Sequence, residues 1–180
     1  MKLKTKELII CAMFASITAI LAQISIPIPF STVPLTMQVF AVTISGVILG
    51  AKKGFISQLI YVMVGAIGIP IFAQMSGGLG IIFGYTGGFI ISFPIMALLI
   101  GYVSEKYEKI PYIMISMILA LCINYMIGTM WYSFIAGVSM IEGFIVCVAP
   151  FIISDIIKIS LATTIGINIK RRLKKEVFTC

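Results

Sequence analysis

The chain has 180 residues, of which 61% are hydrophobic and 11% are charged, and its net charge is +7. Because a soluble domain carries roughly 25% charged residues, this composition excludes a soluble globular protein and indicates an integral membrane protein. A spanning helix needs about 20 mostly apolar residues, so the length allows roughly six spans and leaves no room for a separate soluble domain.

Charged residues and turn formers divide the first half of the chain into three apolar segments. The first is expected to span the membrane over residues 8–24, and the three prolines of SIPIPFSTVPL, residues 25–35, prevent a helix from continuing. The second and third spans are expected over 36–50 and 55–69, joined by the turn AKKG. Pro70 then opens a glycine-rich loop that precedes the second half of the chain.

The second half is expected to contain spans over 86–104, 111–133 and 151–168. The last span starts after Pro150, because residues 141–168 as one helix would measure about 42 Å, and the hydrocarbon core of a bilayer is roughly 30 Å thick. The predicted fold is therefore an all-α membrane protein, a compact bundle of six transmembrane helices with structured external loops. We expect residues 1–180 to form a single transmembrane domain.

The basic residues predict the orientation of this bundle. Every lysine and arginine except Lys158 lies near the N-terminus, near the C-terminus, or in the turns AKKG and EKYEK, whereas the other loops carry Glu142 as their only charge. In a six-span topology these basic positions share one side, which the positive-inside tendency predicts to be cytoplasmic, with both termini there. We therefore expect a multi-pass membrane protein whose net positive charge is an orientation signal. The lipid bilayer is an expected partner, and nucleic acid is not.

Several catalytic motifs are absent from the sequence. There is no GxxxxGK[ST] phosphate-binding loop, no histidine, and no nucleophile with a base partner. The cysteines do not have metal-ligand spacing. The sequence therefore predicts neither an enzyme nor a metal site, and no cofactor is expected.

Glycines are concentrated in GGLGIIFGYTGG, residues 77–88. Glycine allows backbone N–H and C=O groups to approach a ligand closely, and non-helical backbone at membrane depth is tolerated only where protein buries it or it lines a cavity. A flexible external loop is one interpretation of this segment. The hydrophobic residues between the glycines favour the other, a folded loop that packs against the bundle.

Asp155 and Lys158 lie three residues apart in the apolar run APFIISDIIKIS. A charged side chain at the centre of a membrane helix costs roughly 2.5–3.5 kcal/mol on insertion scales, so it needs a partner or a wet cavity. Residues at i and i+3 share a helix face, so the two side chains can neutralise each other. A binding role is the second interpretation, because the pair offers both an acceptor and a donor to a polar ligand.

The segment from residue 48 to 94, with GAIGIPIFAQ, a paired glycine and GYTGG, resembles the signature region of the BioY family. These proteins are the biotin-specific substrate-binding S components of energy-coupling factor (ECF) transporters. IPIPFSTVPLTMQ at 26–38, NYMIGTMWY at 124–132 and APFIISDIIK at 149–158 are similar to further motifs of the family. The resemblance thus covers nearly the whole chain in order.

The sequence departs from the family pattern at three positions. Tyr85 stands where the family usually has proline, and Ile153 and Ser154 stand where it usually has proline and glycine. The change at Tyr85 replaces a rigid turn former with a bulky ring, and the other two allow the last helix to begin earlier. None of the three removes a donor or an acceptor of the motifs.

The resemblance implies that this chain captures biotin from outside and delivers it inward together with a transmembrane coupling (T) subunit and two cytoplasmic ATPases. An S component for another vitamin and a stand-alone small-molecule carrier are the alternatives. Either Trp131 or Tyr85 is expected to pack on the apolar bicycle of biotin. The candidate substrate-binding residues are Asp155, Lys158, Thr86, Tyr85, Gly84, Gly87, Gly78, Trp131, Asn124 and Gln38.

Small residues recur on the first predicted helix. Cys11, Ala15 and Ala19 are spaced every four residues, and Ala12 and Ser16 follow on an adjacent line. Such a stripe allows close packing of membrane helices, and packing within the bundle is one interpretation. The resemblance implies the other, because S components present a small-residue surface of the first helix to the coupling subunit.

Overall fold

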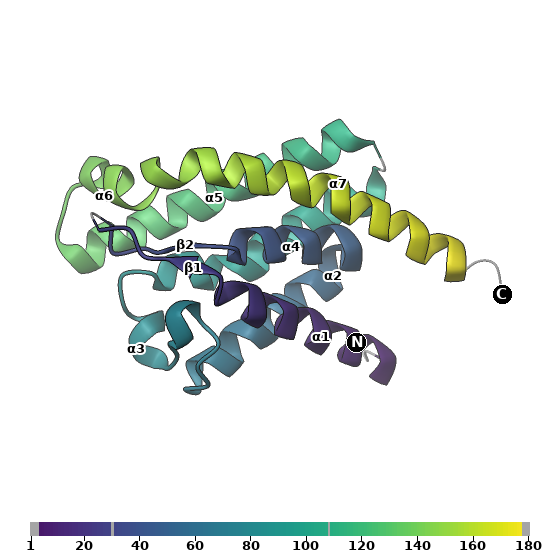
Figure 1. The fold of residues 1–180 in the computed structure, drawn as a ribbon, viewed down its shortest axis with the longest axis horizontal. Helices are drawn as coiled ribbons and strands as arrows, with labels where there is room; N and C mark the ends of the chain where they lie inside the picture. Colours follow the sequence, from purple (N-terminus) through teal and green to yellow (C-terminus); the bar gives the residue numbers. More distant parts are fainter. Residues whose placement is uncertain (1–3, 30, 108, 178–180) are drawn as a thin grey trace.

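The computed structural model describes residues 4–29, 31–107 and 109–177. Its α-helices within these ranges are α1 (Thr5–Ala22), α2 (Gln38–Ala66), α3 (Leu79–Ile82), α4 (Gly87–Lys106), α5 (Ile110–Ala136), α6 (Met140–Cys147) and α7 (Ile152–Val177). They form an elongated bundle in which the start of α1 and the end of α7 lie at the same end (Figure 1).

Five helical stretches in the described part of the chain are long and apolar enough to cross a membrane. They are Thr5–Ala22, Gln38–Ala66, Gly87–Lys106, Ile110–Ala136 and Met140–Leu173. The predicted helical membrane bundle is confirmed at this level. The side of the membrane that the termini face stays a prediction.

Helix α2 is a hairpin of two arms, residues 38–49 and 51–66, because Gly50 interrupts it with φ 81° and ψ −178°. Gln58 Nε2 lies 3.0 Å from Ser45 Oγ, although these residues are 13 positions apart, a separation that would measure about 20 Å along one straight helix. At the far end of the arms, Gln38 Nε2 donates to the hydroxyl of Tyr61 at 2.6 Å. The second and third predicted spans therefore correspond to the two arms.

The chain reverses direction within α2 at a different position from the one that the sequence predicted. A turn was expected over AKKG, but the second arm begins at Ala51 and these residues are helical. A single glycine is sufficient because its φ and ψ lie in a region that other residues hardly populate. A four-residue turn is therefore not needed.

Gly50→Ala is expected to lower the free energy of unfolding by about 1–3 kcal/mol from backbone strain alone. A Cβ at this position would also lie 2.1 Å from Glu105 Oε1 and displace that side chain. Gly137→Ala is the matched control, since Gly137 also has a positive φ, 67°, but meets nothing within 4 Å. Thermal unfolding in detergent should show the larger loss for Gly50→Ala, and equal losses would contradict the steric part of the argument.

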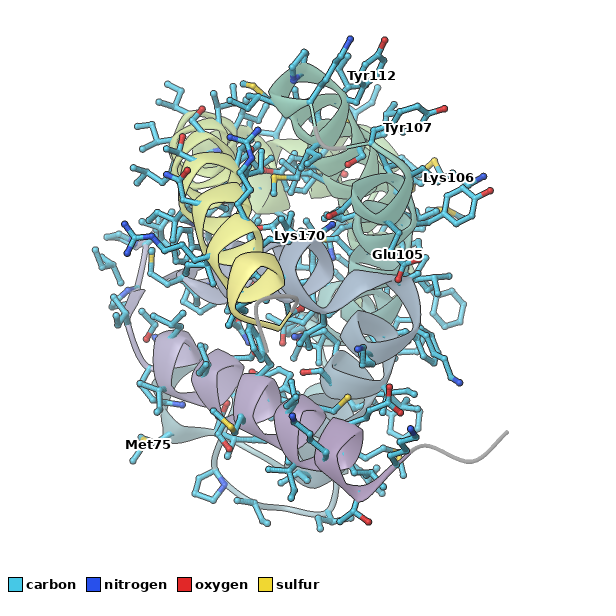
Figure 2. All side chains as sticks on the ribbon, turned by 90° about the vertical axis from the view of Figure 1, so that its right-hand side faces the viewer. Met75, Glu105, Lys106, Tyr107, Tyr112 and Lys170 are labelled. Carbon is cyan, nitrogen blue, oxygen red and sulfur yellow. The ribbon has the colours of Figure 1, made fainter. Side chains whose placement is uncertain are left out.

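We call the end of the bundle that carries the lysines and arginines the basic end. Polar contacts join the helices that meet there. The backbone N–H of Ala51 donates to Glu105 Oε1 at 3.0 Å, which places a carboxylate at the start of the second arm, where the helix dipole favours it. The ammonium of Lys170 donates to the carbonyl and, at 2.6 Å, to the hydroxyl of Ser104, and Ser104 Oγ donates to Val47 O at 2.8 Å. Figure 2 looks onto this end and labels Glu105 and Lys170.

The other end, which we call the loop end, carries two folded loops. In the first, residues 23–37, strand β1 (Ser25–Ile26) pairs antiparallel with β2 (Leu35–Thr36). Ser31 Oγ donates to the carbonyl of Val146 at 2.8 Å and joins this loop to α6. The prolines thus end the helix as expected, and a short two-stranded sheet takes its place.

The second loop, residues 67–86, contains a short 3-10 helix, η1 (Ala73–Met75), and α3. Phe72 is buried in the hydrophobic core. Gln23 joins the loop to the end of α1, because its Nε2 donates to Phe72 O at 3.0 Å and its Oε1 accepts from the backbone N–H of Met75 at 2.9 Å. Within the glycine-rich segment, residues 77–88, Ile82 is buried and the carbonyl of Gly84 accepts from Trp131 Nε1 at 3.0 Å. The segment is therefore a folded loop that packs into the bundle, as its apolar residues indicated.

The last span begins where the proline argument placed it. Helix α6 ends at Cys147, a 3-10 turn, η2 (Ala149–Phe151), contains Pro150, and α7 starts at Ile152. Helix α7 continues to Val177, past the predicted boundary at 168, so the basic tail is helical as far as the structure describes it. The first helix starts at Thr5 rather than at residue 8.

Candidate ligand-binding cavity

A cavity of about 480 Å³ lies at the loop end, between the two loops, the first arm of α2, and helices α4, α5 and α7. This volume is within the range typical of small-molecule sites, roughly 300–1,000 Å³. Its buried walls are predominantly apolar and include several aromatic side chains. The buried side chains that form them include Phe72, Phe89, Ile90, Phe93 and Phe151.

The charged pair forms the polar floor of this cavity. Asp155 is 3% exposed and Lys158 is 7% exposed, and Lys158 Nζ lies 2.7 Å from Asp155 Oδ1. The hydroxyl of Tyr125, on α5, donates to the other carboxylate oxygen, Asp155 Oδ2, at 2.6 Å. Both oxygens of the carboxylate thus have a partner and a fixed orientation.

This arrangement limits what the floor can bind. Among the described residues that line the cavity, Asp155 and Lys158 carry the charges, and these cancel. Each carboxylate oxygen keeps a further lone pair, and the ammonium keeps two of its three N–H groups. The floor therefore presents an acceptor and a donor side by side at zero net charge.

Two neutral polar groups supplement the pair. Gln38 accepts at Oε1 from Thr36 Oγ1 at 2.9 Å and donates to Tyr61, whose hydroxyl donates in turn to Ile71 O at 3.2 Å. Gln38 is therefore held in one orientation and linked to the second loop. Asn124 uses its amide N–H groups on Phe89 O at 3.0 Å and Ser92 Oγ at 2.6 Å, which leaves its carbonyl oxygen for a ligand.

The structure brings most of the predicted substrate-binding residues together. Those that line the cavity are Asp155, Lys158, Thr86, Tyr85, Gly84, Asn124 and Gln38. Tyr85 lies at the rim, 47% exposed, with its ring 5.6 Å from that of Tyr132. Gly78 and Gly87 are not among the lining residues. A Cβ at Gly87 would lie 1.7 Å from the carbonyl oxygen of Ile82, so this glycine permits close backbone packing.

Trp131 is also not among the lining residues, so of the two aromatic side chains expected to pack on the ligand, Tyr85 is the one that lines the cavity. The indole Nε1 of Trp131 donates to Gly84 O at 3.0 Å. Its Cβ would lie 2.4 Å from a Cβ added at Gly88. Trp131 therefore fixes the glycine segment against α5 from outside the cavity, and Gly88 makes this close approach possible.

The sequence interpretation missed Tyr125 and the wall phenylalanines Phe89 and Phe93. Phe89 and Phe93 are four positions apart, and this spacing on a helix was the available signal. Tyr125 follows Asn124 in the motif NYMIGTMWY, but nothing in the sequence places its hydroxyl against α7. Such a contact depends on how two helices are rotated against each other.

The small-residue stripe of α1 is divided between two faces. Cys11 and Ala15 are buried in the bundle, and the thiol of Cys11 donates to Lys53 O at 3.5 Å. This placement corrects the expectation that both residues contact a coupling subunit. Ala19 is partly buried against the core, whereas Ala12 and Ser16 are exposed.

The described residues contain no group of three or more His, Cys, Asp or Glu side chains that could hold a metal ion.

A family model described as "BioY family" matches residues 1–175. The chain belongs to the BioY family.

BioY relatives match almost the whole chain. The "Probable biotin transporter BioY" of Pyrococcus horikoshii is 43% identical over 91% of this chain and 96% of its own length. The "Biotin transporter BioY" of Thermotoga maritima is 34% identical, with 92% and 96% covered. The crystal structure of the S-component for biotin from an ECF-type ABC transporter superposes with a TM-score of 0.87 at 25% identity, covering 94% of this chain and 95% of that one.

The departures from the BioY pattern leave the floor of the cavity intact. Ile153 is 76% exposed, so its side chain points away from the bundle. Ser154 Oγ donates to Phe151 O at 2.9 Å, within the start of α7. Tyr85 changes the rim rather than the charged pair.

Proposed function

We propose that this chain is the biotin-binding S component of an ECF-type uptake transporter. The observation that carries the proposal is the neutral, buried Asp155–Lys158 pair at the floor of an apolar cavity, in a member of the BioY family. The cyclic urea of biotin has an N–H and a carbonyl on the same edge. The N–H can donate to Asp155 and the carbonyl can accept from Lys158, while the aromatic walls surround the apolar bicycle.

The same pair disfavours the carboxylate of the valerate tail. A charge about 4 Å from each member of the pair would gain about 4 kcal/mol from Lys158 and lose about the same to Asp155, at an effective dielectric constant of 20. Burying the carboxylate still costs several kcal/mol of desolvation. The neutral head of biotin therefore fits the floor better than the anionic tail does.

The proposed orientation in a prokaryotic cell membrane places the basic end in the cytoplasm and the cavity towards the outside. The distribution of Lys and Arg supports it. Membership of the BioY family and the likeness to an ECF S component support a transmembrane coupling subunit and two cytoplasmic ATPases as partners. The lack of a phosphate-binding loop in this sequence agrees with ATP hydrolysis by separate subunits. The chain would act by binding and release, without catalysis and without a cofactor.

A vitamin panel tests this function directly. We expect biotin to raise the melting temperature of the detergent-purified protein and to give a saturable calorimetric signal, and riboflavin and thiamine to give neither. Stabilisation by another vitamin alone would assign the chain to that vitamin. Uptake of biotin by liposomes that contain this chain alone would instead favour a stand-alone carrier.

Tyr125→Phe is expected to weaken biotin binding by about 10- to 100-fold, which corresponds to a hydrogen bond to a charged group. The hydroxyl orients the Asp155 carboxylate through its bond to Oδ2, and without it the carboxylate can rotate onto Lys158. Isothermal calorimetry measures the loss. Tyr112→Phe, at an exposed tyrosine of the basic end, is the control and should bind as the parent does. Unchanged binding by Tyr125→Phe would show that Asp155 needs no such support.

A further inference from the structure

The rim of the cavity is uncharged. Its exposed lining residues are Thr32 of the first loop, Gln74 of the second loop, Gly80 and Tyr85. The lysine of the floor already donates to Asp155. If the head of a ligand occupies the floor, the part of the ligand that reaches the rim therefore contacts only neutral groups.

The rest of the loop end offers no cation in its place. Every lysine and arginine other than Lys158 lies near the N-terminus, in the first turn of the second arm of α2, at the end of α4 or just before α5, or in the last part of α7, and is therefore at the basic end or outside the described residues. Figure 2 labels two of them, Lys106 and Lys170, at that end. Outside the cavity, the loop end carries the negatively charged side chain of Glu142. Its carboxylate accepts hydrogen bonds from the backbone N–H and the hydroxyl of Ser139, at 2.9 Å each. An anionic tail thus gains no ion pair at this end and keeps its charge in water.

We infer that the carboxylate of biotin is not a recognition element of this site, so the chain also binds biotin derivatives with a neutral tail, namely esters and amides. This inference rests on the proposed function and extends its substrate class. A carboxylate that stays hydrated at the rim contributes little to affinity, and its conversion to an ester or amide removes no contact. The cyclic urea, by contrast, is indispensable because it is the part that matches the charged pair.

Competition against labelled biotin on the purified full-length chain tests the inference, with biotin, biotin methyl ester and biotinamide as probes. We expect the three affinities to agree within about tenfold, a difference of about 1.4 kcal/mol. The amide controls for the greater apolar character of the ester. A larger loss for both derivatives, with biotin still bound, overturns the inference and leaves the proposed function standing. Failure of biotin itself to bind overturns the proposed function and the inference with it.

A charge introduced at the rim gives an independent readout. Thr32→Lys should raise the affinity for biotin several-fold relative to biotin methyl ester, since an exposed ion pair is worth roughly 0.2–1 kcal/mol, up to about fivefold. Ile26→Lys places the same charge on β1, at an exposed residue that does not line the cavity, and should leave the ratio unchanged. An equal response of biotin and its ester to Thr32→Lys would place the tail away from the rim and overturn the inference.

Discussion

Lys158→Met and Asp155→Asn are each expected to weaken biotin binding by about 10- to 100-fold or more, because each removes a hydrogen bond between the ligand and a charged group, worth about 1.5–3 kcal/mol. Each variant leaves one charge at the floor without its partner. The floor then no longer presents a charged acceptor and a charged donor side by side to the cyclic urea. Both single variants should still insert and fold, since Tyr125 continues to hold residue 155 from α5. Calorimetry with biotin measures the affinity, and thermal unfolding without biotin measures the stability.

The double variant Asp155→Asn, Lys158→Met distinguishes binding from neutralisation. It removes both charges, so the ligand-free protein should recover stability while biotin binding stays lost. Glu7→Gln with Lys53→Met is the matched control, because that pair is 3.9 Å apart and about one-third exposed, and exposed pairs contribute only about 0–1 kcal/mol. If the double variant at the floor regained biotin binding as well as stability, the pair would serve only to neutralise itself.

The sequence was sufficient for those features that depend on local chemistry. Prolines and charges determine where membrane helices end, so the break at Pro150 and the non-helical first loop agree with the structure. The cost of a charge in a bilayer alone singled out Asp155 and Lys158. The aligned motifs supplied Gln38, Thr86 and Asn124, which line the cavity.

Features that depend on helix rotation and tertiary packing were not accessible in the same way. The hydroxyl of Tyr125 reaches Asp155 from another helix, and Trp131 packs outside the cavity because Gly88 lets α5 approach. Gly50 replaces a four-residue turn because its backbone angles suit glycine alone. The pattern of residue types along the chain does not predict these contacts or this reversal, because they depend on how the helices pack in three dimensions.

The stripe of small residues on α1 shows the same limit. Small residues allow close approach of a helix, but the pattern does not say whether that helix belongs to the same chain. The structure assigns Cys11 and Ala15 to the inner face. Ala15→Trp is therefore expected to disrupt the bundle itself and would not isolate the contact with a coupling subunit.

Ala12→Trp is expected to abolish co-purification with the coupling subunit and ATP-driven biotin uptake, while the isolated protein binds biotin as the parent does. Ala12 and Ser16 are exposed on α1, one turn apart, and they form the small-residue surface that the bundle leaves open. A tryptophan there prevents the close packing on which helix association in membranes depends.

Met13→Trp is the matched control, because Met13 is a large side chain, 56% exposed on the same helix. Replacing one large residue with another at the lipid-facing surface should leave both co-purification and uptake unchanged. If Ala12→Trp also kept its coupling subunit, or if Met13→Trp lost it, the contact would lie on a different face of α1. Loss of biotin binding by isolated Ala12→Trp would instead mean that α1 rotates to bury this line within the bundle.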